Sequence, residues 1–264
     1  MGKIIYILIL IYLSSCTKES SENKDTSKTS VNPDYKERVE VLVGVTDTKQ
    51  LPIVFENGSG LSADLCDLLN KNQDKYFFKS IVCPTKRLRE LARRGQVHLA
   101  AFQNLKWSWR DQTDQRSITL LKDKDVFITL KKDGLSQDVF KFGKANSIAL
   151  VRDFHYSFLK TQENALPLIM KVKDESAVVE VVTNGQAEFG AVSQALVDYI
   201  KVKDSGRYQN LYISDSFDSE YERYYVITKS SPIKADELNT FLEALKNSGA
   251  LEKLFHLYGI NVPK

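Results

Sequence analysis

Cysteine is scarce in this sequence, with three in 264 residues. So few cysteines exclude a disulfide-stapled scaffold, and their spacing fits neither paired CxxC zinc ligation nor a CxxC redox centre. The chain also lacks an HExxH metal motif, a phosphate-binding loop and a nucleophile elbow. We therefore predict no metal, no cofactor and no enzymatic activity.

An excess of charge of one sign is missing as well. The 37 Lys and Arg residues nearly balance the 34 Asp and Glu residues, which leaves a formal net charge of +3. No basic run is interleaved with aromatic residues, so we predict no nucleic-acid partner. A composition of 42% hydrophobic and 27% charged residues is typical of a soluble globular protein.

The apolar run at the N-terminus is too short to cross a bilayer. Ile4 to Leu13 would span roughly 15 Å as a helix, about half of the apolar thickness of a membrane. Lys3 precedes the run and small residues follow it, which is typical of a secretory signal peptide. The stretch Leu13-Ser14-Ser15-Cys16 resembles the lipobox of bacterial lipoproteins. We expect residues 1–15 to be removed and Cys16 to be lipidated; the alternative is an ordinary signal peptide with an incidental cysteine.

Residues 16–34 have the composition of a flexible tether. They are rich in Ser, Thr, Lys and Asn, with Val31 as the one sizeable apolar side chain after the cysteine, too little to offset ordering entropy. The lipoprotein resemblance implies a domain held on the periplasmic side of the cell envelope. Thr17 follows the cysteine where Asp would signal inner-membrane retention, which favours the outer membrane if the cell has two.

From residue 39 onward, strand-like and helix-like segments alternate, which predicts an α/β fold with mostly parallel sheets. Strands are expected at 39–45, 76–82, 97–102, 124–130, 147–151, 168–172, 187–192, 210–214 and 224–228. Helices are expected at 61–69, 85–94, 154–161, 175–183 and 194–202, and two more within 234–256, broken near 248–249. The alternation restarts midway, which indicates two similar halves. The C-terminal helices have no strands of their own and should return to the first half.

Several segments resemble the extracellular solute-binding proteins of family 3, which serve polar amino-acid importers. The carriers are GLSADL at 60–65, LRELARRG at 88–95 followed by VHLAAFQNLKWSWR at 97–110, and GQAEFGAV at 185–192. The resemblance implies the type II periplasmic binding fold, two lobes joined by two hinge crossovers. It places lobe 1 at 35–131, lobe 2 at 132–218 and the return to lobe 1 at 219–264.

The resemblance implies a protein that closes over a small carboxylate-bearing, amino-acid-like ligand for ABC import or for sensing. Its partners would be the ligand, the membrane, and a permease or a membrane sensor. One alternative is an envelope signalling or interaction lipoprotein that keeps the fold without amino-acid binding. Another is a dehydratase-like enzyme on the same fold, for which Asp47, His155 and Glu188 are the candidate acids or bases.

In the first lobe, Arg110 aligns with the arginine that holds the ligand's α-carboxylate, a task suited to a planar guanidinium; the alternative is a surface arginine. Phe102 and Gln103 stand where relatives carry small hydroxyl residues. Trp107 and Trp109 either wall the cleft or anchor the packing. Asp47 either receives a cationic group or is solvated.

In the second lobe, Phe154 and His155 stand where the resemblance implies a turn that opens a helix onto the ligand; His155 alternatively is a partly exposed polar residue. Ser193 replaces the aspartate that binds the α-ammonium, which argues against a standard α-amino acid. Cys66 and Cys83 could form a disulfide, the alternative being two thiols.

Overall fold

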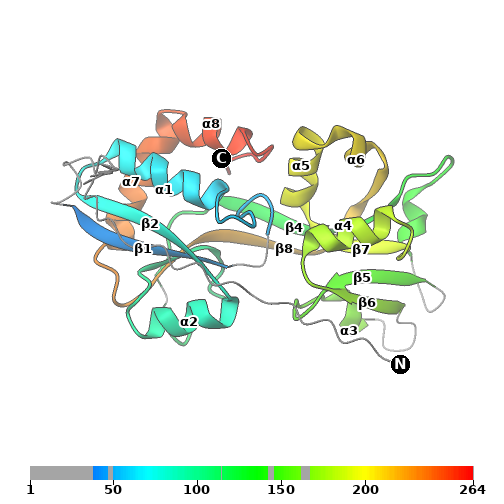
Figure 1. Ribbon diagram of the computed structural model, residues 1–264, viewed down its shortest axis with the longest axis horizontal. Coiled ribbons are helices and arrows are strands. Elements are labelled where there is room, and N and C mark those ends of the chain that lie inside the picture. The colour runs from blue at the N-terminus through cyan, green and yellow to red at the C-terminus, as the bar shows by residue number, and fades with distance from the viewer. Residues whose placement is uncertain (1–37, 47–49, 114, 142–145, 162–166, 264) are drawn as a thin grey trace, which may run out of the picture. The chain divides into compact units, whose positions relative to one another are not determined.

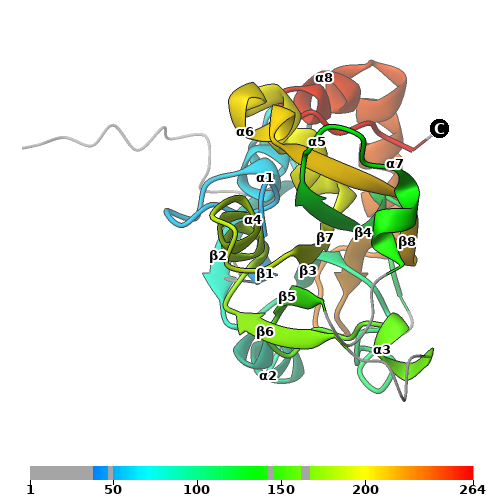
Figure 2. The ribbon, with the colours of Figure 1, turned by 90° about the vertical axis from the view of Figure 1, so that its right-hand side faces the viewer.

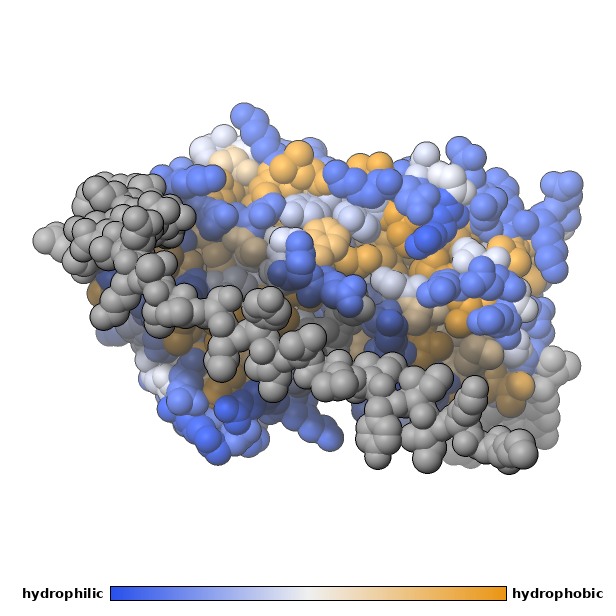
Figure 3. Space-filling view, in the orientation of Figure 1, coloured by the Kyte–Doolittle hydropathy of each residue, from blue (hydrophilic) through white to orange (hydrophobic). Residues whose placement is uncertain are grey.

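The computed structural model of the chain describes residues 38–46, 50–113, 115–141, 146–161 and 167–263. The predicted signal peptide, lipidated cysteine and tether, as well as Asp47, lie outside the described residues. Within the described part, no helix has the length and apolarity needed to cross a bilayer. Hydrophilic side chains are spread over the face shown in Figure 3, with smaller apolar areas between them.

The first three strands form a parallel group (Figure 1). Strand β1 (Val39–Thr46) pairs in parallel with β2 (Tyr76–Cys83) along its length and with β3 (Leu99–Gln103). Helix α1 (Leu61–Asn72) covers one face of these strands and α2 (Thr85–Arg93) the other. Together with the C-terminal helices α7 (Ala235–Asn247) and α8 (Ala250–His256), these elements make up what we call lobe 1.

A second parallel group follows in lobe 2. Strand β5 (Ser147–Val151) pairs in parallel with β6 (Leu168–Val172) and β7 (Phe189–Ser193). The helices of this lobe are α3 (Phe158–Thr161), α4 (Glu175–Thr183), α5 (Gln194–Lys203) and α6 (Ser205–Gln209). A 3-10 turn, η2 (Gln137–Phe140), precedes β5.

Two long antiparallel strands connect the lobes (Figures 1 and 2). Strand β4 (Leu121–Leu130) and β8 (Leu211–Ile227) pair with each other from 121–223 to 130–211. β8 also pairs with β3 of lobe 1, and β4 with β7 of lobe 2. The strand order is therefore β2-β1-β3-β8-β4-β7-β5-β6, and β4 and β8 are the crossing strands.

Each parallel group is covered on both faces, as buried parallel strands require. In lobe 1, Val41, Val43 and Val45 alternate into a core shared with the stripe Leu61, Leu65 and Leu69 of α1, and with Leu238, Leu242 and Phe255 of the C-terminal helices. Leu88, Ala92 and Trp109 fill the opposite face under α2. The C-terminal helices thus pack on the strands that begin the chain.

Gly44 of β1 is required by this packing. A Cβ at this position would lie 2.1 Å from Cδ1 of Leu88 and 3.0 Å from Cγ1 of Val97. Helix α2 therefore approaches the strand closely only because position 44 has no side chain.

The α/β fold with two lobes is confirmed, and most predicted elements lie within a few residues of the observed ones. Helix α3 starts at Phe158 rather than 154, because the chain turns at Asp153, whose φ is 64°. The strands predicted at 210–214 and 224–228 are one strand of 17 residues. The polar residues between them resemble a loop in sequence, but they pair with β4.

Cys66 and Cys83 do not form the disulfide considered above. Cys66 points from α1 into the core under that helix, whereas Cys83 packs against the core on the α2 face. The sheet separates the two side chains. Burial raises the pKa of the Cys66 thiol to about 12.

Candidate ligand-binding site

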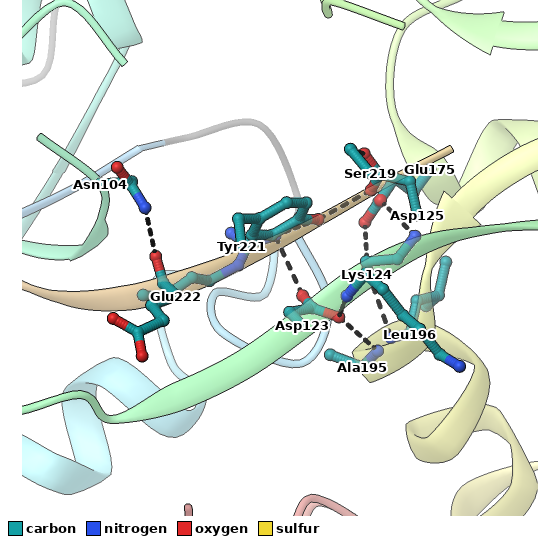
Figure 4. Close-up of polar contacts among 12 residues, drawn as sticks. Asn104, Asp123, Lys124, Asp125, Glu175, Ala195, Leu196, Ser219, Tyr221 and Glu222 are labelled. Atoms are coloured by element: carbon teal, nitrogen blue, oxygen red, sulfur yellow. Dashed lines mark hydrogen bonds and ion pairs between the residues drawn. The ribbon is translucent and has the colours of Figure 1, made fainter. Parts of the chain in front are cut away.

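Charged and polar side chains gather where the crossing strands pass between the lobes (Figure 4). Asp123 and Asp125 are two residues apart on β4, as are Tyr221 and Arg223 on β8, so each pair shares a face of its strand. Lobe 1 adds Trp107, and lobe 2 adds Glu175 from α4 and Ser193 from the end of β7. We call Trp107, Asp123, Asp125, Glu175, Ser193, Ser219, Tyr221 and Arg223 the hinge cluster.

Arg223 is the cation of this cluster and has donors to spare. Its Nη2 lies 3.1 Å from Oδ2 of Asp123, and both side chains are 1% exposed. The same nitrogen donates to the Tyr221 hydroxyl at 3.2 Å, and the guanidinium lies over the rings of Trp107 and Tyr221 at 5.3 and 5.0 Å. Nε and Nη1 are buried and have no hydrogen-bond partner among the described residues. Buried donors without partners are rare in native proteins.

The two aspartates of β4 are held differently. Oδ1 of Asp123 accepts from the backbone N–H of Lys124 at 2.9 Å and of Ala195 at 3.2 Å. Asp125 accepts from the hydroxyls of Ser219 at 2.9 Å and Tyr221 at 2.7 Å. Burial raises the pKa of Asp125 in spite of these bonds.

Glu175 is 4% exposed and forms a pair with Ser193. Its Oε1 accepts from the backbone N–H of Ser193 at 2.7 Å, and its Oε2 accepts from the Ser193 hydroxyl at 3.0 Å. Burial raises the pKa of Glu175 to about 7, while Arg223 acts in the opposite direction. This carboxyl group therefore changes its charge near neutral pH.

Two helix N-termini position this pair. Asp174 is the N-cap of α4 and accepts from the N–H of Ala177 at 2.8 Å, so Glu175 is the first residue of that helix. Ser193 is the N-cap of α5 and accepts from the N–H of Leu196 at 3.3 Å. The positive ends of both helix dipoles consequently lie beside the Glu175 carboxylate.

A groove of about 680 Å³ lies between the lobes, and it is lined by residues other than those of the hinge cluster. Its size is within the range of small-molecule sites. Lobe 1 contributes the loop after β1, and lobe 2 contributes the first turns of α4. Asp174 lines the groove and the next residue, Glu175, belongs to the hinge cluster, so α4 joins the two. The lining residues are Leu51, Phe55, Glu56, Asn57, Ser59, Lys173, Asp174, Ser176, Ala177 and Glu180.

The lobes also touch directly beside this groove. The rings of Phe55 and Tyr199 lie 5.7 Å apart. At Gly259 of lobe 1, an added Cβ would lie 2.6 Å from the backbone oxygen of Asp198 in α5. Asn104 links lobe 1 to β8 by donating to the backbone oxygen of Glu222 at 2.7 Å (Figure 4).

By sequence, no family model and no curated protein matches the chain. By structure, it is similar to a protein of glutathione import in Streptococcus mutans, with a TM-score of 0.66 and 18% identity over 86% of this chain and 98% of that one. The GluR0 ligand-binding core of Nostoc punctiforme, solved with L-glutamate, gives 0.64 and 16% over 83% and 98%. An ancestral amino-acid-binding protein, a precursor of cyclohexadienyl dehydratase, gives 0.62 and 16% over 83% and 95%. The chain has the type II periplasmic binding fold.

Arg110, which the sequence predicted to bind the ligand's carboxylate, is exposed. Among the described residues, its side chain has no hydrogen-bond or ion-pair partner. Gln103 is buried, and its Oε1 accepts from Nε1 of Trp109 at 3.2 Å. Trp109 is 1% exposed and is a packing anchor. Phe102 lies in the core of lobe 1, where its ring is 6.3 Å from that of Phe255. Phe102 and Gln103 are thus engaged with their own lobe.

Two of the remaining candidates, Ser193 of lobe 2 and Trp107 of lobe 1, belong to the hinge cluster. Phe154 and His155 are exposed in the turn before α3. The backbone N–H groups at the start of that helix, from residues 157 and 158, donate to the carboxylate of Asp218 at 2.8 and 2.6 Å. Asp218 of the protein itself therefore accepts from the start of α3, where the sequence resemblance had placed the ligand.

Asp123, Asp125, Glu175 and Arg223 did not emerge from the sequence. A signal was present: the two aspartates stand two apart in KDKDVFITL, and Arg223 stands in YERYYVI beside apolar and aromatic neighbours. Charged residues at one face of an otherwise buried strand require partners. Which partners meet them depends on the pairing of β4 with β8, about 100 residues apart.

Proposed function

We propose that this protein is a membrane-anchored, extracytoplasmic solute-binding protein that closes over a small carboxylate-bearing ligand, and that Arg223 binds the carboxylate. The observation that carries the proposal is the pair of buried, partnerless donors Nε and Nη1 on Arg223. Each of these two nitrogens shares a different edge of the guanidinium with Nη2, and a carboxylate pairs with arginine along such an edge. A ligand carboxylate at either edge would give one of the two buried donors a partner.

Three features support closure of the lobes around the ligand. The hinge cluster takes side chains from both lobes and both crossing strands, and the groove is lined by both lobes. Trp107 and Tyr221, with ring centroids 5.2 Å apart, provide an aromatic wall beside the guanidinium. Proteins of similar structure include one of glutathione import and one solved with L-glutamate. A ligand that contacts both lobes favours the closed state by its differential affinity.

Delivery to an ABC permease and presentation to a membrane sensor both fit this role. Anchoring through lipidated Cys16 would keep the domain on the periplasmic side of the cell envelope in either case. Replacing Cys16 by Ser should move the protein from the membrane to the soluble fraction and abolish its labelling by a fatty-acid analogue. Labelling that survives this change would contradict the anchor.

A thermal-shift screen of the purified protein against amino acids, other carboxylates and peptidoglycan fragments tests the binding role. A ligand present at a hundred times its Kd adds about 2.7 kcal/mol of stability. Arg223→Lys keeps the charge but removes the fork, so we expect it to weaken binding of any hit by about tenfold or more. Arg110→Lys and the surface variant Arg87→Lys are the matched controls.

The outcomes separate the alternatives. If Arg110→Lys, rather than Arg223→Lys, removes binding, the carboxylate site is the one indicated by the sequence resemblance. Turnover of a hit would indicate an enzyme. Absence of any hit would favour an interaction lipoprotein without a small-molecule ligand, a reading supported by the internal Gln103–Trp109 and Asp218–α3 contacts.

A further inference from the structure

Helix α2 carries a cluster of cations on its outer side. The helix is amphipathic, because Leu88 and Ala92 are buried against the sheet while the charged side chains of KRLRELARR lie on the other sides of the helix. In Figure 1, α2 lies on the face of the sheet opposite to α1. The exposed cations of the helix are Lys86, Arg87, Arg93 and Arg94.

The turn at 105–112 extends this surface. It packs its apolar side chains on the same cluster under α2 as Leu88. Nη2 of Arg93 lies 3.9 Å from Oδ2 of Asp111, so the exposed Arg110 of the preceding position belongs to the same surface. We call this surface the basic face; its cations are Lys86, Arg87, Arg89, Arg93, Arg94, Lys106 and Arg110.

The basic face concentrates positive charge. Its seven cations face two acids, Glu90 and Asp111, which leaves a net charge of +5, whereas the whole chain has a net charge of +3. Glu90 accepts from Arg87 at 3.0 Å and also from Arg94. The hydrogen bond from Arg87, followed by the charges of Arg94 and Arg93, holds the pKa of Glu90 below its usual range. One carboxylate among these arginines leaves most of their charge unbalanced.

This arrangement favours an extended anionic surface over a small anion. The groove between the lobes is lined by none of these cations, which instead spread along the outside of α2 and the neighbouring turn. Five of the seven are arginines, whose guanidinium groups bind the oxygens of a phosphate in pairs. The headgroups of an anionic bilayer present phosphates over an area of this kind.

The basic face includes the end of lobe 1 at which the chain enters the lobe. Strands β1, β2 and β3 are parallel, and α2 returns from the end of β2 to the start of β3. Arg93 and Arg94 at the end of α2 therefore lie at the same end of the sheet as Arg38, which precedes β1. The predicted tether joins the lobe at this end, and a coil of its length spans roughly 25 Å. A lipid on Cys16 would keep these arginines within reach of headgroups.

We propose that the basic face docks lobe 1 on the anionic phospholipid surface of the membrane that holds the lipid anchor. This inference rests on the anchoring in the proposed function and goes beyond it, because it names a second contact with the membrane and the side of lobe 1 that makes it. An acyl anchor and a polybasic surface together bind a membrane more durably than either alone.

Vesicle co-sedimentation of the full-length Cys16→Ser protein tests the docking without the lipid. We expect vesicles with about 30% phosphatidylglycerol to bind it about tenfold or more better than pure phosphatidylcholine vesicles. This preference should disappear as the salt concentration rises from about 0.05 to about 0.5 M. Binding through the apolar N-terminal run does not depend on headgroup charge and is common to all variants, so the ratio between the two vesicles reports the electrostatic contact.

Two triple variants locate the contact. Each cation near an anionic surface contributes about fivefold, so Arg87→Gln, Arg93→Gln and Arg94→Gln together should lower the preference by about tenfold or more. Lys131→Gln, Lys132→Gln and Lys203→Gln remove the same charge from exposed positions of lobe 2 and should change it by less than about threefold. If the triple variant of α2 fails to fold, the three single substitutions decide, each with an expected loss of about two- to fivefold.

The outcomes separate this proposal from the proposed function. Equal binding to both vesicles overturns the docking and leaves the anchor and the ligand site, which Cys16 labelling and the ligand screen test. An equal loss in both triple variants overturns the role of the basic face. Retention on immobilised poly-glutamate without a preference between vesicles assigns the basic face to an acidic protein and overturns the membrane proposal. If Cys16 is not labelled in cells but the vesicle preference persists, the anchor is wrong and the docking stands.

Discussion

Replacing Glu175 by Gln should remove a loss of stability that the wild-type protein undergoes as the pH rises from 5 to 8. The side chain is 4% exposed, and burial raises its pKa from the ordinary 4.5 to about 7. At a pH between these two pKa values, Glu175 holds a proton in the folded protein that it has released in the unfolded chain. The stabilisation from this proton is thus fully present below pH 4.5 and is lost as the pH rises through 7.

The size of the effect follows from the two pKa values. One pKa unit corresponds to 1.36 kcal/mol, so the free energy of unfolding should fall by about 2.5 kcal/mol between pH 5 and pH 8 on account of this one group. Gln keeps the shape and one acceptor for Ser193 but does not titrate. We therefore expect Glu175→Gln to gain about 2.5 kcal/mol relative to the wild type over the same interval.

Urea unfolding of the ligand-free protein, followed by tryptophan fluorescence at pH 5, 6, 7 and 8, measures this difference. Other titrating groups are common to both proteins and cancel, including His98, whose pKa is lowered by burial and which acts with the opposite sign. Glu180→Gln, at an exposed position of the same helix, is the control and should follow the wild type. Equal pH slopes for wild type and Glu175→Gln would refute the reasoning.

Three further changes test individual contacts of the fold. Gly44→Ala places a Cβ 2.1 Å from Leu88 and should destabilise the protein by about 1–3 kcal/mol in urea unfolding; an unchanged midpoint would show that α2 moves freely. Asp123→Asn leaves the Arg223 guanidinium without its 3.1 Å ion-pair partner and should cost about 3–5 kcal/mol, whereas a cost under about 1 kcal/mol would mean that the pair is not buried in solution. Tyr258→Phe removes a 2.6 Å hydrogen bond to a carboxylate of α1 and should lower stability by about 1 kcal/mol, measured by the same assay; no change would indicate that water replaces the bond.

The helices and strands could be predicted from the sequence because their hydrophobic periodicity is visible over a few neighbouring residues. Val41, Val43 and Val45 alternate, and the stripe Leu61, Leu65 and Leu69 has helical spacing, so strand and helix follow from where each chain segment can bury its apolar side. The order of these segments then led to two lobes. Even the break between α7 and α8 could be read at Gly249, whose φ is 71°.

The candidate site could be predicted only in part. Ser193 and Trp107 were singled out and lie in the hinge cluster, whereas Gln103 and Phe102 pack within lobe 1. Arg110 remains a prediction. The charged members of the cluster were missed because a strand shows its alternation in the sequence but not which side chains from other strands will face it.

The sequence by itself determined the α/β class, the order of the elements and the segments that bury their apolar faces, because these depend on residues a few positions apart. Only the tertiary structure decided that Arg223 meets Asp123 and that Glu175 meets Ser193. Those contacts depend on the register of β4 against β8 and on two helix starts that converge, and the free energy of a buried charge is set by such distant neighbours rather than by adjacent residues.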